Sequence, residues 1–345
     1  MRLGIVVDYS DDFLTAAAEV LEAERIGVDI VSIAEAYSFD AVSRLGYLAA
    51  TTSTIHLASG ILPLFSRTPT MIGMTAAGLD DMSGGRFELG LGASGAQVIE
   101  GWHGVPYSKP LARMRETVEI CRAVWRREPI DHQGPNYFIP LPADEGTGLG
   151  KPLKLINKPK RDRIPIAIAA LAHKGVAQAA EIAEGWIPLF YWPERADRAW
   201  GEALTEGSAL RDPALGSLDI QVVAPLLIGD HTDQALDGYR ARIALYVGGM
   251  GAVGANFYND LAVRYGFPDE AARVEELYLA GEKPAAIAAV PEELVRATAL
   301  IGSESEVRDR VAALAAAGVT TLSAQALLPD SSARLEQLEA LRALL

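Results

Sequence analysis

The chain has 345 residues and a formal net charge of −14, and half of its residues are hydrophobic while 22% are charged. This composition supports a large core and excludes a disordered chain, and the acidic balance argues against a general nucleic-acid binder, which needs a basic face for phosphates. Cys121 is the only cysteine, no charged segment followed by a long apolar run opens the chain, and no apolar run approaches a membrane span. We therefore expect a cytoplasmic protein without a nucleic-acid or membrane partner.

Short apolar runs alternate with helical patterns in the first third of the chain. Residues 3–8 form a run typical of a buried strand, and residues 11–26 follow with apolar side chains at helical spacing until Gly27. The same alternation predicts strands at residues 30–35, 55–62 and 87–94, and helices at residues 40–51, 69–82 and 108–127. Cys121 lies on the apolar face of the last of these helices, so we expect a core residue without a catalytic role.

The periodicity disappears over residues 128–163, a loop rich in Pro and Gly that ends in the basic segment 151–163. The alternation then resumes, with strands at residues 164–171, 186–191, 218–228 and 320–327 and helices at residues 174–184, 194–210, 233–247 and 331–345. Residues 248–300 contain no convincing strand and are interpreted as a helical insertion. Ser303 with Glu306 forms a capping box that opens a further helix, which Gly318 closes.

Eight strands alternating with helices predict an α/β fold with a parallel sheet, and eight is the strand number of the (β/α)8 TIM barrel. A TIM barrel takes about 250 residues. We therefore expect a single domain over residues 1–345, with insertions near 128–163 and 248–300. An open doubly wound sheet is the alternative, but no G-x-G-x-x-G follows the first strand, and the glycines at 90 and 92 come too late for that fingerprint.

The active site of a TIM barrel lies at the carboxyl ends of its strands. Here these ends carry mainly small, apolar and aromatic residues and one acid. They include Glu35, Gly60, Ile61, Ser94, Gly95, Ala170, Leu171, Ala172 and the run Phe190-Tyr191-Trp192. The five histidines, including His231, are scattered without metal-ligand spacing, so we expect no metal site, and no nucleophile stands beside a base as a hydrolase requires. Such a surface suits a flat ring system, with the chemistry carried by a cofactor.

Each of these features also has a structural interpretation. Glu35 could cap the following helix, and Ser94-Gly95 could be an ordinary turn. Gly84-Gly85 is interpreted as a helix end and turn, and His103 as a surface or packing residue. The aromatic run at 190–192 could belong to the core, although a pocket wall is at least equally favoured at the end of a barrel strand.

Several motifs resemble the bacterial luciferase-like superfamily, and within it the oxidoreductases that use the deazaflavin coenzyme F420. The matching stretches are Ile33-Ala-Glu-Ala-Tyr37, Leu62-Pro-Leu-Phe-Ser-Arg-Thr-Pro69, Leu79-Asp-Asp-Met-Ser-Gly-Gly-Arg86, Leu89-Gly-Leu-Gly-Ala-Ser-Gly-Ala-Gln-Val-Ile-Glu-Gly-Trp102, Tyr246-Val-Gly-Gly-Met-Gly251 and Asn256-Phe-Tyr258. The resemblance covers almost the whole chain. It implies hydride transfer between F420 and a small organic substrate, and we expect a homodimer.

The resemblance also implies a place for the coenzyme. Its ring would lie against a cis Gly60–Ile61 peptide, its side chain against the turn that contains Ser94, Gly95, Gln97 and Val98, and its phosphate on the backbone of Ala170, Leu171 and Ala172. The chain departs from the family at two points. Relatives usually carry glycines at 171 and 172, and many have an aspartate–histidine pair where this chain has Glu35-Ala36. Glu35 would be the acid/base or the ring-orienting group of the pocket.

Two further expectations remain open. An FMN-dependent two-component monooxygenase is the alternative activity, and a flavin-binding or storage protein without catalysis is a third. The basic segment 151–163 holds six basic residues and one acid. A solvated surface is its simple interpretation, but F420 carries a phosphate and an anionic glutamate tail, so we also predict that the segment lies near the barrel mouth and contacts this tail.

Overall fold

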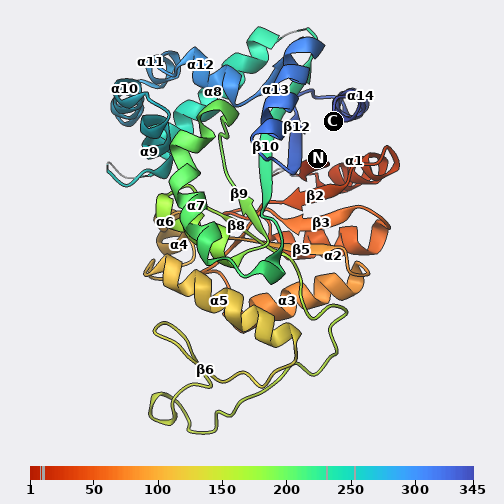
Figure 1. Cartoon of the computed structure of the whole chain (residues 1–345), viewed down its shortest axis with the longest axis vertical. Coiled ribbons are helices and arrows are strands. Elements are labelled where there is room, and N and C mark those ends of the chain that lie inside the picture. The colour runs from red at the N-terminus through yellow and green to blue at the C-terminus, as the bar shows by residue number, and fades with distance from the viewer. Residues whose placement is uncertain (8, 10–11, 231, 252–253) are drawn as a thin grey trace.

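Parallel strands follow one another around a closed barrel at the centre of the computed structural model, which describes residues 1–7, 9, 12–230, 232–251 and 254–345 (Figure 1). The strands of the barrel wall are β1 (Arg2–Val7), β2 (Ile30–Ile33), β3 (His56–Ser59), β4 (Leu62–Pro63), β5 (Phe87–Gly92), β8 (Ile166–Ala169), β9 (Gly185–Ile187), β10 (Asp219–Ile228) and β12 (Thr321–Ala326). The ring runs β1-β2-β3-β5-β8-β9-β10-β12, and β12 pairs with β1 to close it. The expected TIM barrel is confirmed.

Helices surround the barrel and form the predicted insertion after β10. They are α1 (Phe13–Arg25), α2 (Ala41–Thr51), α3 (Pro69–Met82), α4 (Ala96–Gly101), α5 (Pro110–Trp125), α6 (His173–Ile182), α7 (Glu202–Leu210), α8 (Thr232–Gly249), α9 (Phe257–Arg264), α10 (Pro268–Leu279), α11 (Lys283–Ala288), α12 (Glu292–Ala297), α13 (Glu304–Ala316) and α14 (Ser331–Arg342). Short helical turns lie at η1 (Ala143–Glu145), η2 (Pro193–Arg195), η3 (Asp197–Gly201) and η4 (Pro213–Leu215). Within the described ranges, no helix combines the length and the apolar character that crossing a membrane requires.

Local signals account for several helix ends. The capping box between Ser303 and Glu306 is present at the start of α13, and Gly318 follows that helix with φ +85°. Asp40 accepts a hydrogen bond from the Ser43 amide at the start of α2. Gly84 and Gly85 have positive φ values of 74° and 94° after α3, which confirms their structural role.

The structure differs from the sequence prediction at a few elements. The third predicted strand is divided into β3 and β4, and the Gly60–Ile61 peptide between them is cis, as expected. β9 ends at Ile187, and Phe190, with φ 51°, cannot continue an extended strand. The elements that the sequence analysis missed include α4, the short strands β6 (His132–Gln133) and β7 (Phe138–Ile139), and the edge strand β11 (Leu300–Gly302), which pairs with β10. Three residues of the sequence analysis lie outside the described residues. They are Asp8 at the end of the first predicted strand, Asp11 at the start of the first predicted helix, and the histidine His231.

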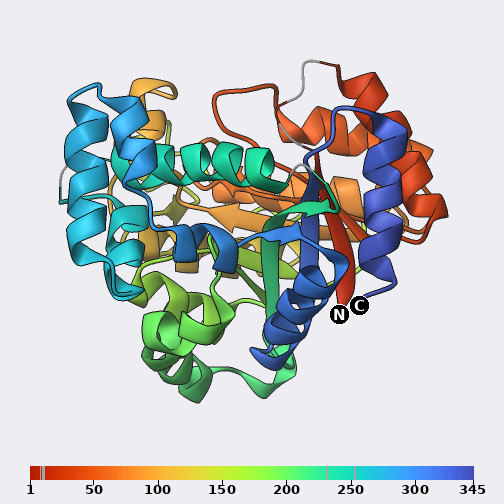
Figure 2. The same ribbon diagram turned by 90° about the horizontal axis from the view of Figure 1, so that it is seen from above.

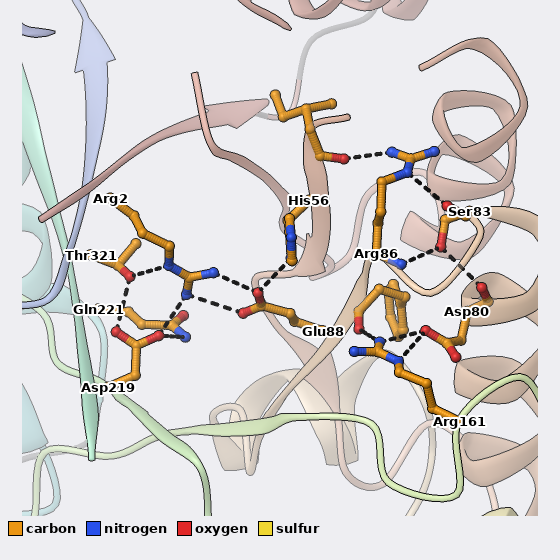
Figure 3. Close-up of polar contacts among 12 residues, drawn as sticks. Arg2, His56, Asp80, Ser83, Arg86, Glu88, Arg161, Asp219, Gln221 and Thr321 are labelled. Carbon is orange, nitrogen blue, oxygen red and sulfur yellow. Dashed lines mark hydrogen bonds and ion pairs between the residues drawn. The ribbon is translucent and has the colours of Figure 1, made fainter. Parts of the chain in front are cut away.

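A polar network fills the amino-terminal end of the barrel (Figure 3). Arg2, the first residue of β1, donates to Glu88 and to Asp219 at 2.6 Å each. His56 lies 3.0 Å from Glu88. Burial alone would raise the pKa of Glu88, but the hydrogen bonds from His56 and Arg2 and the charge of Arg2 lower it to about 2. With this end occupied by ion pairs, the opposite end of the barrel remains for a ligand.

Three basic residues at the end of the segment 128–163, Lys160, Arg161 and Arg163, contact residues at the amino-terminal side of the barrel, which contradicts the prediction that the basic segment reaches the barrel mouth. Its short strands β6 (His132–Gln133) and β7 (Phe138–Ile139) pair with each other, and Glu116 of α5 holds His132 at 3.0 Å. Arg161 donates to Asp80 at the end of α3 and to the carbonyl of Phe87, the first residue of β5 (Figure 3). The segment joins the end of α5 to the start of β8, and both lie at the amino-terminal side of the barrel (Figure 1).

Cys121 is fully buried on the inner face of α5, as expected. Burial raises the pKa of its thiol, and its Sγ lies 3.6 Å from the carbonyl oxygen of Pro69 in α3. The thiol is thus a core contact between α5 and α3.

Candidate functional site

The candidate site residues follow four neighbouring positions of the barrel wall. Glu35 comes after β2, Gly60 and Ile61 stand between β3 and β4, Ser94 and Gly95 follow β5, and 170–172 follow β8. In a parallel barrel these positions share the carboxyl-terminal edge. The structure therefore brings the residues to one end of the barrel, although they are spread over more than a third of the chain.

Glu35 is buried and both of its carboxylate oxygens are occupied. Arg67, which follows β4, donates to Oε1 at 2.5 Å and to Oε2 at 2.9 Å, and the amide of Ala41 donates to Oε2 at 2.9 Å. Ala41 is the first residue of α2, so Glu35 satisfies one of the free amides of that helix. The carboxylate thus ties the end of β2 to the end of β4 and to α2. Arg67 lies in one of the stretches that resemble the family, and its contact with Glu35 gives it a structural role.

Close approach at the end of β5 explains two glycines. A Cβ at Gly92 would stand 2.9 Å from Cδ1 of Ile61, and a Cβ at Gly60 would stand 3.0 Å from Cβ of Ser32. A side chain at Gly92 would require Ile61 to shift, and one at Gly60 would press closely on Ser32. The absence of a side chain at Gly92 lets Ile61 lie over the end of β5.

The turn after β5 has an unusual backbone and an open side. Ser94 has φ 60°, a left-handed conformation that is uncommon for residues other than glycine and that occurs often at functional sites. A Cβ added at Gly95 would meet nothing within 4 Å. In α4, Gln97 is exposed and Val98 is half-buried. Among the described residues, His103 Nε2 just beyond α4 is buried without a hydrogen-bond partner.

Two indole groups and a guanidinium fix the loop at 170–172. Trp186 Nε1 donates to the carbonyl of Ala170 at 2.9 Å, and Trp200 Nε1 donates to the carbonyl of Leu171 at 3.0 Å. Arg264 of α9 donates to the same Leu171 carbonyl at 2.8 Å. The loop is therefore held from the carbonyl side, and α6 begins immediately after Ala172.

Exposed aromatic side chains stand beside Glu35 and the turn at Ser94. Tyr37 and Trp102 are 65% and 67% exposed, and their ring centroids are 6.4 Å apart. Two exposed rings in contact with each other form a small apolar surface beside the candidate residues. They fit a ligand with a flat ring, as does the open space at Gly95.

The aromatic run at 190–192 belongs to the core, and the expectation of a pocket wall is wrong for two of its rings. Tyr191 and Trp192 are each 4% exposed. Tyr191 stacks on Trp200 with centroids 5.6 Å apart, and Trp192 packs on Tyr265. Both rings therefore pack on residues of the elements outside the barrel wall.

A second group of polar side chains at this end was missed by the sequence analysis. Arg242 of α8 donates to Gln325 Oε1, near the carboxyl end of β12, at 2.5 Å. The rings of Tyr246 and Tyr258 pack edge to face with centroids 4.8 Å apart, and both contact Phe190. The available signal was the spacing of Arg242 and Tyr246, which places both on one face of the helix.

Comparison with known proteins agrees with this architecture. Residues 5–321 match the family model for luciferase-like monooxygenases. The chain is 41% identical over 327 residues to a protein of Mycobacterium tuberculosis that is provisionally named a coenzyme F420-dependent oxidoreductase, covering 93% of this chain and 94% of that protein. It is 27% identical over 304 residues to a 5,10-methylenetetrahydromethanopterin reductase of Archaeoglobus fulgidus, covering 86% of this chain and 85% of the relative.

A solved structure has the same fold. The coenzyme F420-dependent tetrahydromethanopterin reductase of Methanopyrus kandleri superposes with a TM-score of 0.80 at 22% identity, over 98% of this chain and 97% of that chain. The family model, the identity over nearly the whole chain and the barrel itself agree: the chain belongs to the family of luciferase-like monooxygenases.

Proposed function

We propose that the protein transfers a hydride between coenzyme F420 and a small organic substrate. The observation that carries this proposal is the convergence of Glu35, Gly60, Ile61, Ser94 and the loop at 170–172 on one end of the barrel. The relatives named for F420 support the choice of coenzyme. When bound, the deazaflavin supplies the hydride-carrying carbon.

The residues of this chain would bind and orient the coenzyme. Ile61 would support one face of the ring, the turn that contains Ser94, Gly95, Gln97 and Val98 would contact its side chain, and Ala170, Leu171 and Ala172 would lie against its phosphate. The open space at Gly95 and the exposed rings of Tyr37 and Trp102 fit such a ligand.

Glu35 acts in this proposal as a positioning residue. Both of its oxygens are occupied by Arg67 and the Ala41 amide, which leaves little capacity for accepting a substrate proton. Its carboxylate instead holds the guanidinium of Arg67 at the edge of the ring site. Of the two functional roles that the sequence left open for Glu35, the orienting role agrees with these contacts, and the contact with the Ala41 amide also fits the alternative of a helix cap.

Parallel titrations test the coenzyme choice. F420 and FMN are each added to the purified protein while its tryptophan fluorescence is followed, and oxygen consumption is measured with the reduced form of each. We expect tighter binding of F420 and no oxygen-dependent turnover, because a carbon at position five does not readily activate oxygen. Preference for FMN with oxygen consumption would establish the monooxygenase alternative.

A further inference from the structure

Arg242, Tyr246 and Tyr258 gather on the side of the barrel mouth away from the candidate coenzyme residues. Arg242 reaches Gln325 on β12, and the two tyrosines contact Phe190, which follows β9. The coenzyme residues follow β2 to β8, so the sector formed by β9, β10 and β12 remains for another ligand. Figure 2 shows α8 in teal, lying across the barrel strands.

The guanidinium of Arg242 is half-buried and has no acidic partner among the residues that the structure describes. Its contacts are the Gln325 amide oxygen and the ring of Tyr246, whose centroid lies 5.8 Å from Cζ. No carboxylate within the described part of the chain forms an ion pair with it. Arg240 on the same helix provides a contrast, because it is paired with Glu292 and with the carbonyl of Val290. A half-buried cation that keeps free donors is costly unless a ligand pairs with it.

The two phenols add further donors beside this cation. Neither the Tyr246 nor the Tyr258 hydroxyl forms a hydrogen bond with any residue that the structure describes. Burial raises the pKa of Tyr258, and the neighbouring phenols of Tyr246 and Tyr9 raise it further. Tyr258 therefore stays protonated and can donate a hydrogen bond. The ring of Phe190 packs against this group, with its centroid 5.4 Å from that of Tyr246.

We propose that Arg242, Tyr246 and Tyr258 form the substrate subsite of the mouth and bind the carboxylate of a flat, largely apolar substrate. A guanidinium binds a carboxylate through two parallel hydrogen bonds, and the phenols complete the ring of donors around it. The aromatic rings supply the apolar wall for the rest of the molecule. This inference rests on the proposed function in one respect, because it assigns the other sector of the mouth to the coenzyme.

Anionic groups could reach this subsite from two sources, the substrate or the glutamate tail of F420. Benzoate and its neutral isostere benzamide serve as substrate probes, with binding to the purified full chain measured by ligand-observed NMR. F420 is titrated against the same samples by fluorescence. Arg242→Gln removes the cation, and Arg240→Gln is the matched control, since it removes one charge from the same helix at a residue with internal partners.

We expect the protein to bind benzoate at least tenfold more tightly than benzamide. Arg242→Gln should abolish this preference by lowering the affinity for benzoate about 10–100-fold, the contribution of a hydrogen bond to a charged group. The affinities for benzamide and F420 should not change. Arg240→Gln should retain the preference. Tyr258→Phe should weaken benzoate binding without removing a charge from the fold, so the test stands even if Arg242→Gln does not fold.

Other outcomes overturn the inference or separate it from the proposed function. Equal binding of both probes, or no detectable binding of either, refutes the subsite. A loss of F420 affinity in Arg242→Gln with unchanged benzoate binding assigns Arg242 to the coenzyme tail instead. If the protein does not bind F420 but discriminates the probes through Arg242, the anion subsite stands and the proposed coenzyme is wrong.

Discussion

Arg67 donates to both carboxylate oxygens of Glu35, at 2.5 and 2.9 Å, and thereby joins the loops after β2 and β4 at the barrel mouth. The carboxylate is 7% exposed and the guanidinium 17%, so the pair is shielded from solvent on most sides. Such a pair is fixed in its geometry, because a bidentate contact between a guanidinium and a carboxylate restrains both groups.

Replacement of this carboxylate should reveal its role. If Glu35 positions Arg67, Glu35→Gln should weaken F420 binding about tenfold, equivalent to about 1.4 kcal/mol. The rate constant kcat and the pH profile should change little. Arg67→Gln should have a similar effect, and the double variant should be no worse than either single one, because both disturb one contact.

Two other results would contradict this role for Glu35. A fall in kcat of about 10²–10⁴-fold at unchanged F420 affinity is the signature of a proton-transfer group. A lower melting temperature with unchanged binding and turnover would leave Glu35 as a cap of α2 alone.

Gly92→Ala tests the placement of the coenzyme ring over Ile61. The added methyl would stand 2.9 Å from Cγ1 and Cδ1 of Ile61, so that side chain must move. We expect a loss of about 1–3 kcal/mol in stability from overpacking and a weaker affinity for F420 in fluorescence titrations. Gly78→Ala is the control, since nothing lies within 4 Å of the added methyl. An unchanged affinity for F420 in Gly92→Ala would show that the coenzyme ring does not lie against Ile61.

The basic segment should contribute to stability through Arg161 rather than to coenzyme binding. Arg161 pairs with Asp80, whose exposure is 0%, so Arg161→Gln leaves a buried carboxylate without its partner. We expect a loss of about 3 kcal/mol in chemical denaturation. Lys158→Gln, at an exposed position in the same segment, should change neither stability nor F420 affinity. A salt-dependent loss of F420 binding in Lys158→Gln would show that the segment contacts the coenzyme and would contradict this account.

Ionisation of Glu88 should make the free energy of unfolding depend on pH in the acidic range. Its folded-state pKa of about 2 lies below the ordinary value of 4.5, so ionisation favours the folded state. This contribution is complete above pH 4.5 and is lost as the pH falls through about 2. Glu88→Gln should therefore destabilise the protein by about 3 kcal/mol near neutral pH, and the difference from the unmodified protein should shrink between these two pH values in urea denaturation. A difference that does not vary with pH would contradict this account.

An exposed apolar stripe on α3 is the place where we expect the homodimer to form. Met71, Met74 and Met82 are 49%, 50% and 55% exposed, and Tyr47 on the neighbouring α2 is 44% exposed. Met74→Lys should shift the protein toward monomer in sedimentation velocity, because a charge would be buried in the interface. Leu279→Lys, at an equally exposed position on α10, is the control. A protein that is monomeric before any substitution would refute the expectation.

Local sequence signals were sufficient to predict most of the barrel. The apolar runs at residues 87–94 and 320–327 match β5 and β12, since buried parallel strands need continuous apolar side chains. The capping box at Ser303 is a contact within one turn, so it could be read directly. Elements too short to show a hydrophobic period could not be predicted. An example is the three-residue strand β11, which is defined by its pairing with β10.

The sequence by itself determined the strand order, the barrel and the end of it at which the candidate site lies, because these follow from short-range periodicity and the rule that parallel strands share one edge. Only the tertiary structure decided which polar groups meet there. Arg242 and Gln325 are 83 residues apart in the chain, and Arg161 and Asp80 are 81 apart. No local pattern encodes such pairs. Their meeting depends on how α8 crosses the barrel and on which side the long segment returns, and both are fixed by packing between elements that are distant in sequence.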